Sequence, residues 1–182
     1  MIDQKAKKLL SDFALCILKT FNFSLIPTDE NYSEPEIIAE MLGGGIEYDI
    51  KFFDTKVCRC GQGFIIGMYN DEKMRTYQFA EALTILFLKM GYKTDENKFM
   101  KRKNMQYEDR RSCREYVIDE DHVHFLTQEL ILPKSRLEKC VVGHINSEGY
   151  FKINDIIKEL GFPYEFVETR LLETGMIESR WN

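Results

Sequence analysis

The longest apolar stretch of the chain runs from Phe79 to Met90, and it restricts the possible folds more than any other segment. At helical spacing both of its sides are largely apolar, which is typical of a helix that is buried all round. We therefore expect a central buried helix that begins near residue 71 and ends at Gly91. The stretch is too short and too often interrupted to cross a bilayer, which takes roughly 20 apolar residues. The interrupting polar residues are Glu81, Thr84 and Lys89.

The remaining sequence predicts a cytoplasmic protein with one core. Residues 4–20 form an amphipathic pattern with scattered charges and no small-residue cleavage site, so we expect a helix and not a signal peptide. The 182 residues, 44% of them apolar, suffice for one compact domain. Five cysteines are an odd number in a chain without an export signal, so we expect reduced thiols. The Cys58 and Cys60 pair has no second pair to complete a tetrahedral metal site, and we expect neither metal nor cofactor.

Three short segments predict a small sheet beside this helix. They cover residues 46–53, 56–60 and 63–69, with turn signals between them. Their connections are too short for crossovers, so we expect a three-stranded antiparallel meander. The consecutive apolar residues 64–66 favour a last strand buried on both faces. The fold class is therefore α+β, with the sheet packed on the central helix.

The C-terminal third predicts further helices. In a helix from about residue 119 to 132, His122 shares a face with the apolar residues and should point toward the core, whereas His124 should point away. Helices over 153–160 and 164–174 give a helix-turn-helix outline, but the last one is acidic, so we interpret the outline as a packing unit that does not read DNA. We divide the chain into residues 1–140 and a C-terminal helical unit, 141–182, of the same compact domain.

Charge gives one candidate binding surface. The net charge of -5 argues against general nucleic-acid binding. Residues 93–114, however, hold a local excess of basic side chains, which is either a solvated loop or a docking patch for an acidic protein partner. The candidate residues of that patch are Lys101, Arg102, Lys103, Arg110 and Arg111.

Several segments, taken in order, resemble one family. They are EIIAEMLGGGIEYDI from Glu36, GFIIGMYN from Gly63, RTYQFAEALT from Arg75, HVHFLTQELILP from His122 and the stretch from Ile153 to Ile177. Together they are similar to the ImmA/IrrE-type zinc peptidases of bacteria and their mobile elements. The resemblance covers nearly the whole chain and implies a zincin-like fold with an active-site helix of the form H-E-x-x-H.

The residues that would bind zinc in such a helix are missing. Two histidines one turn apart normally hold the ion, and the glutamate between them takes a proton from the metal-bound water. Here Ala80 and Thr84 replace the histidines, and only Glu81 remains. The third ligand of the family aligns near His122 or, with a shift of one residue, Asp121. We expect Glu81 and His122 to be kept as hydrogen-bonding groups of a former site.

The leading hypothesis is a catalytically inactive pseudopeptidase that acts by binding another protein. Family members commonly act on helix-turn-helix repressors, so the resemblance implies regulation of a mobile genetic element or phage through such a repressor. Strand addition along a sheet edge is one way to hold a partner peptide. Two alternatives remain: an atypical metallopeptidase that uses Glu81 and His122 with His124 or Asp121, and a toxin–antitoxin component or phage-encoded inhibitor.

Overall fold

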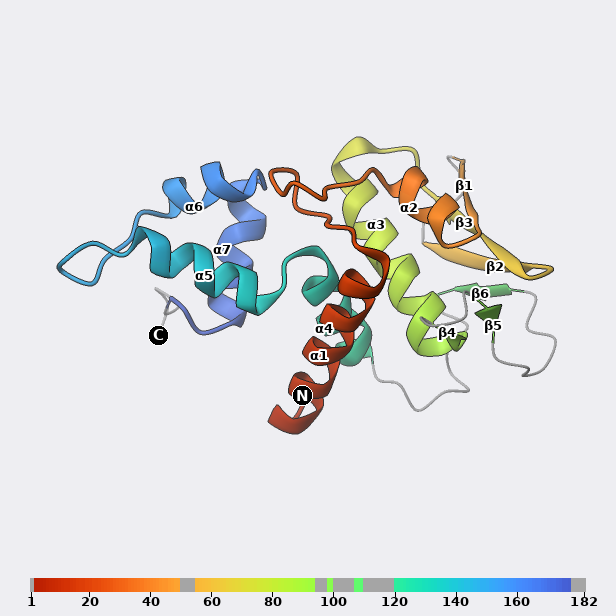
Figure 1. The fold of residues 1–182 in the computed structure, drawn as a ribbon, viewed down its shortest axis with the longest axis horizontal. Coiled ribbons are helices and arrows are strands. Elements are labelled where there is room, and N and C mark those ends of the chain that lie inside the picture. Colours follow the sequence, from red (N-terminus) through yellow and green to blue (C-terminus); the bar gives the residue numbers. More distant parts are fainter. Residues whose placement is uncertain (1, 50–54, 94–97, 100–106, 110–119, 178–182) are drawn as a thin grey trace.

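The protein has an α+β architecture in which the sheet and the C-terminal helices lie at opposite ends (Figure 1). The computed structural model describes residues 2–49, 55–93, 98–99, 107–109 and 120–177. The helices are α1 (Gln4–Phe21), α2 (Pro35–Met41), α3 (Glu72–Thr84), α4 (Glu120–Ile131), α5 (Lys134–His144), α6 (Ile153–Leu160) and α7 (Tyr164–Glu173). The strands are β1 (Gly45–Tyr48), β2 (Lys56–Cys60), β3 (Gly63–Met68), β4 (Tyr92–Lys93), β5 (Lys98–Phe99) and β6 (Tyr107–Asp109). Across these residues, no helix has both the length and the apolar character that a membrane span requires.

The larger sheet is mixed, which corrects the predicted antiparallel meander. Its strand order is β1-β3-β2-β6, and β1 pairs with β3 in parallel. The predicted hairpin of β2 and β3 is present, with Lys56 opposite Gly67 and Cys60 opposite Gly63. The prediction was wrong because β1 does not pair with β2, the strand that follows it in sequence. It also omitted β6, which pairs with the outer side of β2.

The last strand of that hairpin is not buried on both faces. Phe64 and Ile66 are buried, but Ile65 between them is 38% exposed. Successive side chains of a strand point to opposite faces, so β3 presents one face to the core and one outward. The run of three apolar residues was therefore a misleading sign of a strand covered on both faces.

The central buried helix is confirmed. Asp71 caps α3 by accepting a hydrogen bond from the backbone nitrogen of Lys73 at 3.0 Å. From Gln78 to Phe87 every side chain is buried, because α3 packs against β3 and against α4. Past Thr84 the helix continues as a π-helical segment, Ile85–Lys89. Gly91, with a φ of +66°, then turns the chain away from the helix.

The C-terminal unit contains a helix that the sequence reasoning missed. We predicted the helices that became α6 and α7, but α5 was not predicted, and the proposed boundary at residues 140–141 lies inside it. α5 packs against α6, and α6 packs against α7. Pro133 is the N-cap residue of α5 and lies two residues after the end of α4, where a proline commonly follows a helix that has ended.

A buried ion pair joins this unit to the rest of the protein. Arg170 of α7 donates a hydrogen bond to Glu129 of α4 at 2.7 Å, and both side chains are at most 2% exposed. The same guanidinium nitrogen, Nη2, reaches the carbonyl oxygen of Leu132 at 2.9 Å, and Nη1 reaches Glu173 at 3.2 Å. Buried charges are tolerated when they are paired and hydrogen-bonded in this way.

Removal of one member of this pair should destabilise the fold strongly. Arg170→Met leaves Glu129 buried and unpaired, and we expect the free energy of unfolding to fall by about 3–5 kcal/mol. Arg170→Met combined with Glu129→Leu should lose less than the sum of the two single variants, because no lone charge remains. Denaturant unfolding of the four proteins measures this coupling.

A surface pair gives the matched control. Lys134 and Glu138 lie 3.6 Å apart on α5, with side chains 48% and 53% exposed. Substitution of Lys134 by Met should change stability by about 0.5 kcal/mol or less. If the loss of unfolding free energy in the double variant equals the sum of the losses in the two single variants, Arg170 and Glu129 are not coupled.

Candidate functional site

The three positions that match the peptidase motif all lie on the buried part of α3. Ala80 and Thr84 are fully buried, and Glu81 is 5% exposed. The Thr84 hydroxyl donates a hydrogen bond to the carbonyl oxygen of Ala80 at 3.0 Å. It also lies 3.2 Å from the hydroxyl of Thr127 on α4, which is itself fully buried. The two positions that would carry zinc ligands are therefore packed between α3 and α4.

This arrangement gives the motif positions no metal-binding chemistry of their own. An alanine methyl group cannot ligate an ion, and the Thr84 hydroxyl is already engaged by the backbone and by Thr127. Zinc in proteins is held by thiolate, imidazole and carboxylate groups. Of the three positions, only the Glu81 carboxylate has a suitable donor atom.

The two histidines of α4 have different surroundings. His122 is partly buried, and its Nδ1 is a buried atom with no hydrogen-bond partner among the residues that the structure describes. His124 is 47% exposed, and its ring lies 3.3 Å from the Tyr77 hydroxyl and 3.4 Å from Glu173. Asp121 is exposed as well. The contacts of the His124 side chain thus connect α4 to α3 and α7 at the surface.

The predicted docking patch cannot be placed. Lys101, Arg102, Lys103, Arg110 and Arg111 all lie outside the described residues.

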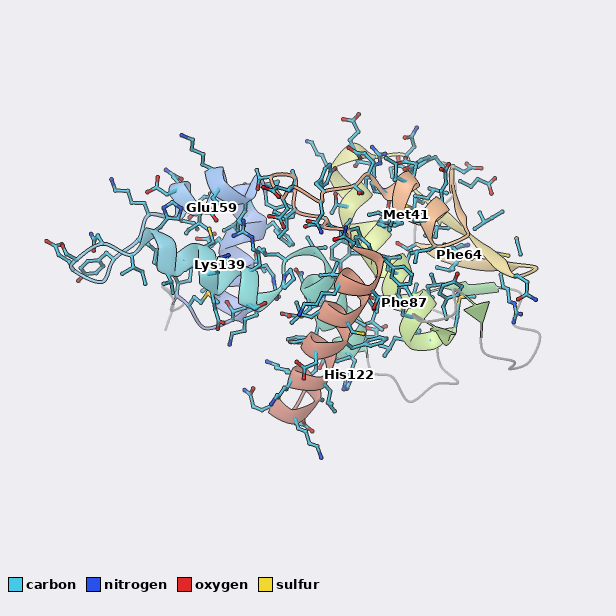
Figure 2. All side chains as sticks on the ribbon, in the orientation of Figure 1. Met41, Phe64, Phe87, His122, Lys139 and Glu159 are labelled. Carbon is cyan, nitrogen blue, oxygen red and sulfur yellow. The ribbon has the colours of Figure 1, made fainter. Side chains whose placement is uncertain are left out.

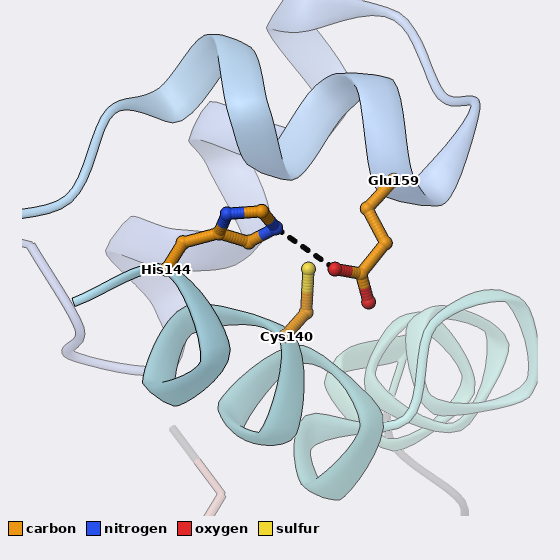
Figure 3. Close-up of side chains that lie close together, drawn as sticks. All are labelled: Cys140, His144 and Glu159. Atoms are coloured by element: carbon orange, nitrogen blue, oxygen red, sulfur yellow. Dashed lines mark hydrogen bonds and ion pairs between the residues drawn. The ribbon is translucent and has the colours of Figure 1, made fainter.

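A second group of chemically capable side chains lies on the C-terminal unit (Figure 3). Cys140 and His144 are one turn apart on α5, and Glu159 extends toward both from α6. One candidate ligand atom of each side chain lies within 4.8 Å of the others. The His144 Nε2 and the Glu159 carboxylate are 2.8 Å apart. Figure 2 shows that Glu159 and His122 lie in different parts of the molecule, so this group is separate from the α3–α4 positions.

An arginine controls the charge of this group. Arg136 of α5 donates to the other Glu159 oxygen at 2.8 Å and also lies 3.3 Å from Asp29. The hydrogen bond from Arg136, helped by His144, lowers the pKa of Glu159 from 4.5 to about 2. Burial, reinforced by the Glu159 carboxylate, raises the pKa of the Cys140 thiol to about 12. At neutral pH the group therefore holds a carboxylate beside a protonated thiol.

The sequence reasoning did not find this group. Cys140 was counted only among the five cysteines, and His144 was given no role. A cysteine and a histidine four residues apart share one face of a helix, and that spacing was the available signal. It could not be used because the helix that carries both residues was not predicted.

Comparisons with known proteins give no further identification: no family model, no curated protein and no solved structure matches the chain.

Restoration of the missing histidines should not restore a zinc site. In the variant Ala80→His with Thr84→His, two imidazoles enter a packed interior, and we expect each to lower the free energy of unfolding by about 1–3 kcal/mol. Denaturant unfolding and metal content by mass spectrometry measure the two effects. Met74→His on the exposed side of α3 is the control and should be nearly neutral. If the double variant stays folded and binds one equivalent of zinc more than the wild type does, the interior between α3 and α4 can open to form a metal site, which would contradict this prediction.

The acid sensitivity of the fold should depend on Glu159. Its pKa is lowered on folding, so its contribution to stability is present above pH 4.5 and is lost as the pH falls toward 2. We expect the stability difference between the wild type and Glu159→Gln to shrink over that window. Because the carboxylate is 38% exposed, the effect should be about 1 kcal/mol or less. Parallel stability curves for the two proteins between pH 2 and pH 5 would contradict the assignment.

Proposed function

We propose that this protein is a cytoplasmic, ImmA/IrrE-like, zincin-like pseudopeptidase that regulates by binding a protein without cutting it. The observation that carries the proposal is the state of the motif positions. Ala80 and Thr84 are fully buried, and the Thr84 hydroxyl is engaged by Ala80 and Thr127. In an H-E-x-x-H helix, peptide hydrolysis needs a metal ion held at these two positions and a glutamate that deprotonates the metal-bound water. Without ligands there, Glu81 has no activated water to deprotonate.

The surface of α2 and β1 supports a protein-binding role. Ile37 and Met41 are one turn apart on α2 and are 53% and 43% exposed, and Tyr48 at the end of β1 is 36% exposed. β1 is an edge of the sheet as far as the structure describes it. An exposed apolar group beside a strand edge suits a partner peptide that adds to the sheet.

Polar contacts hold this surface in shape. Arg75 of α3 forms an ion pair with Glu36 of α2, and its Nε donates to the Tyr48 hydroxyl at 3.1 Å. Tyr48 in turn donates to Glu36. Burial and the Glu36 carboxylate raise the pKa of Tyr48 to about 12, so its hydroxyl stays a donor at physiological pH. One helix, one strand and the start of α3 are thereby fixed relative to one another.

The partner in this proposal is a helix-turn-helix repressor of a mobile element or phage, as the resemblance implies. A repressor that is held and not destroyed can be released, so the regulation would be reversible.

One observation favours a second candidate. The Nδ1 of His122 is buried and has no hydrogen-bond partner within the described part of the chain, so a ligand group could bind there. An atypical metallopeptidase that uses Glu81 and His122 would need such a group. It remains the weaker candidate because Ala80 and Thr84 supply no ligand.

The test is to incubate the full chain with the helix-turn-helix repressor of the element that encodes it, and to follow both proteins by size-exclusion chromatography and intact mass. We expect a complex in which the repressor keeps its full mass. Ile37→Asp with Met41→Asp should weaken binding about tenfold or more, since losing about 1.4 kcal/mol is a tenfold change. Val142→Asp, at a 69% exposed apolar residue of α5, is the matched control and should bind normally.

Two outcomes would contradict the proposal. Cleavage of the repressor that is lost in Glu81→Gln would favour the peptidase. If the two proteins do not associate, the repressor is not the partner of this protein.

A further inference from the structure

We propose that Cys140, His144 and Glu159 form a binding site for a thiophilic divalent cation, with Zn²⁺ as the best fit. This site is independent of the proposed partner binding and of the α3–α4 positions. Among the described residues, this is the one group of three or more metal-binding side chains whose ligand atoms lie this close together.

The ligand types select the metal. Thiolate, imidazole and carboxylate together suit Zn²⁺, whereas Mg²⁺ and Ca²⁺ prefer sites made only of oxygen atoms. Cysteine and histidine at a spacing of four residues reach one ion from a single face of α5, as the two histidines of an H-E-x-x-H helix do. Glu159 supplies the third ligand from a different helix, so the cation would tie α5 to α6.

The distances are close to those of a tetrahedral site. Bond lengths of about 2.0–2.3 Å imply separations between ligand atoms of about 3.3–3.6 Å. The His144 and Glu159 atoms are 2.8 Å apart, and all three ligand atoms lie within 4.8 Å of one another. Rotation of the three side chains would bring these atoms to the separations that a tetrahedral ion requires. A water molecule would take the fourth position.

The charge of the surroundings also fits. Arg136 is balanced by Asp29, to which it lies 3.3 Å away, so Glu159 keeps its negative charge for a cation. When the metal binds, the Cys140 sulfur forms a bond to it and the thiol proton passes to water. His144 would bind the ion through Nε2, the ring nitrogen that faces Glu159. One thiolate and one carboxylate neutralise the double charge of the ion.

Arg136 has the position of an outer-shell partner. It contacts one oxygen of Glu159, Oε1, while the other oxygen, Oε2, faces His144. Ligating carboxylates are commonly oriented by such a second hydrogen bond. The arginine thus holds the carboxylate in place and leaves its inner oxygen available.

Cobalt(II) provides the test because a thiolate bound to it gives an intense charge-transfer absorption. Titration of the reduced full chain with Co²⁺ should give this band at one equivalent, and Zn²⁺ should displace it. Cys140→Ser should abolish the band. His144→Gln, at a side chain 31% exposed, should weaken Co²⁺ binding by about tenfold or more without loss of the fold. Circular dichroism verifies that both variants are folded.

The other thiols give the control. Cys58 and Cys60 lie on β2, and Cys16 is exposed on α1. The variant with serine at these three positions and at Cys113, the remaining cysteine of the sequence, should keep the band and its stoichiometry. Zn²⁺ should also raise the melting temperature of the wild type but not of Cys140→Ser, since a ligand that binds only the folded state stabilises it. A wild type without the band, or a band that persists in Cys140→Ser, would overturn the proposal.

Discussion

The buried ion pair between Arg170 and Glu129 determines how the C-terminal half of the molecule is arranged. It fixes α7 against α4, and α4 packs on both α1 and the central helix α3. The second oxygen of Glu129 accepts a hydrogen bond from the backbone nitrogen of Lys134, the first residue of α5, at 3.3 Å. A carboxylate is favourable at this end of a helix, where backbone nitrogens lack partners. One glutamate therefore both anchors α7 and sets the start of α5.

The sequence predicted the elements that have strong local signals. The helix over 153–160 and the hairpin of β2 and β3 were found with nearly correct bounds, because glycines end the first and turn the second. The parallel pairing of β1 with β3 was not predictable in this way. It depends on contacts between segments about 20 residues apart in the chain, and the assumption that consecutive strands pair was the error. α5 was missed because its buried apolar residues, Leu137, Cys140 and Val141, are few.

In the candidate sites, too, the local features could be predicted from the sequence and the contacts between distant residues could not. That Ala80 and Thr84 offer no zinc ligand could be inferred from their residue types alone. The contact between Thr84 and Thr127 in this interior joins residues 43 positions apart in the chain, so it could be seen only in the structure. The Cys140, His144 and Glu159 group combines one local spacing with one distant residue. Its local part was recognisable only for a reader who already knew that α5 is a helix.

Arg170 and Arg136 each pair with two carboxylates. The difference in their exposure explains why a ligand could bind beside Arg136 but not beside Arg170. Arg170 and its partner Glu129 are almost fully buried, so every exchange of partners there carries a desolvation cost, and the pair can only be structural. Arg136 and Glu159 are 27% and 38% exposed, so solvent and small ions reach them. Glu159 has one oxygen committed to the arginine and one directed at His144. The buried pair therefore stabilises the fold. The partly exposed pair instead places a charged carboxylate oxygen beside a thiol and an imidazole.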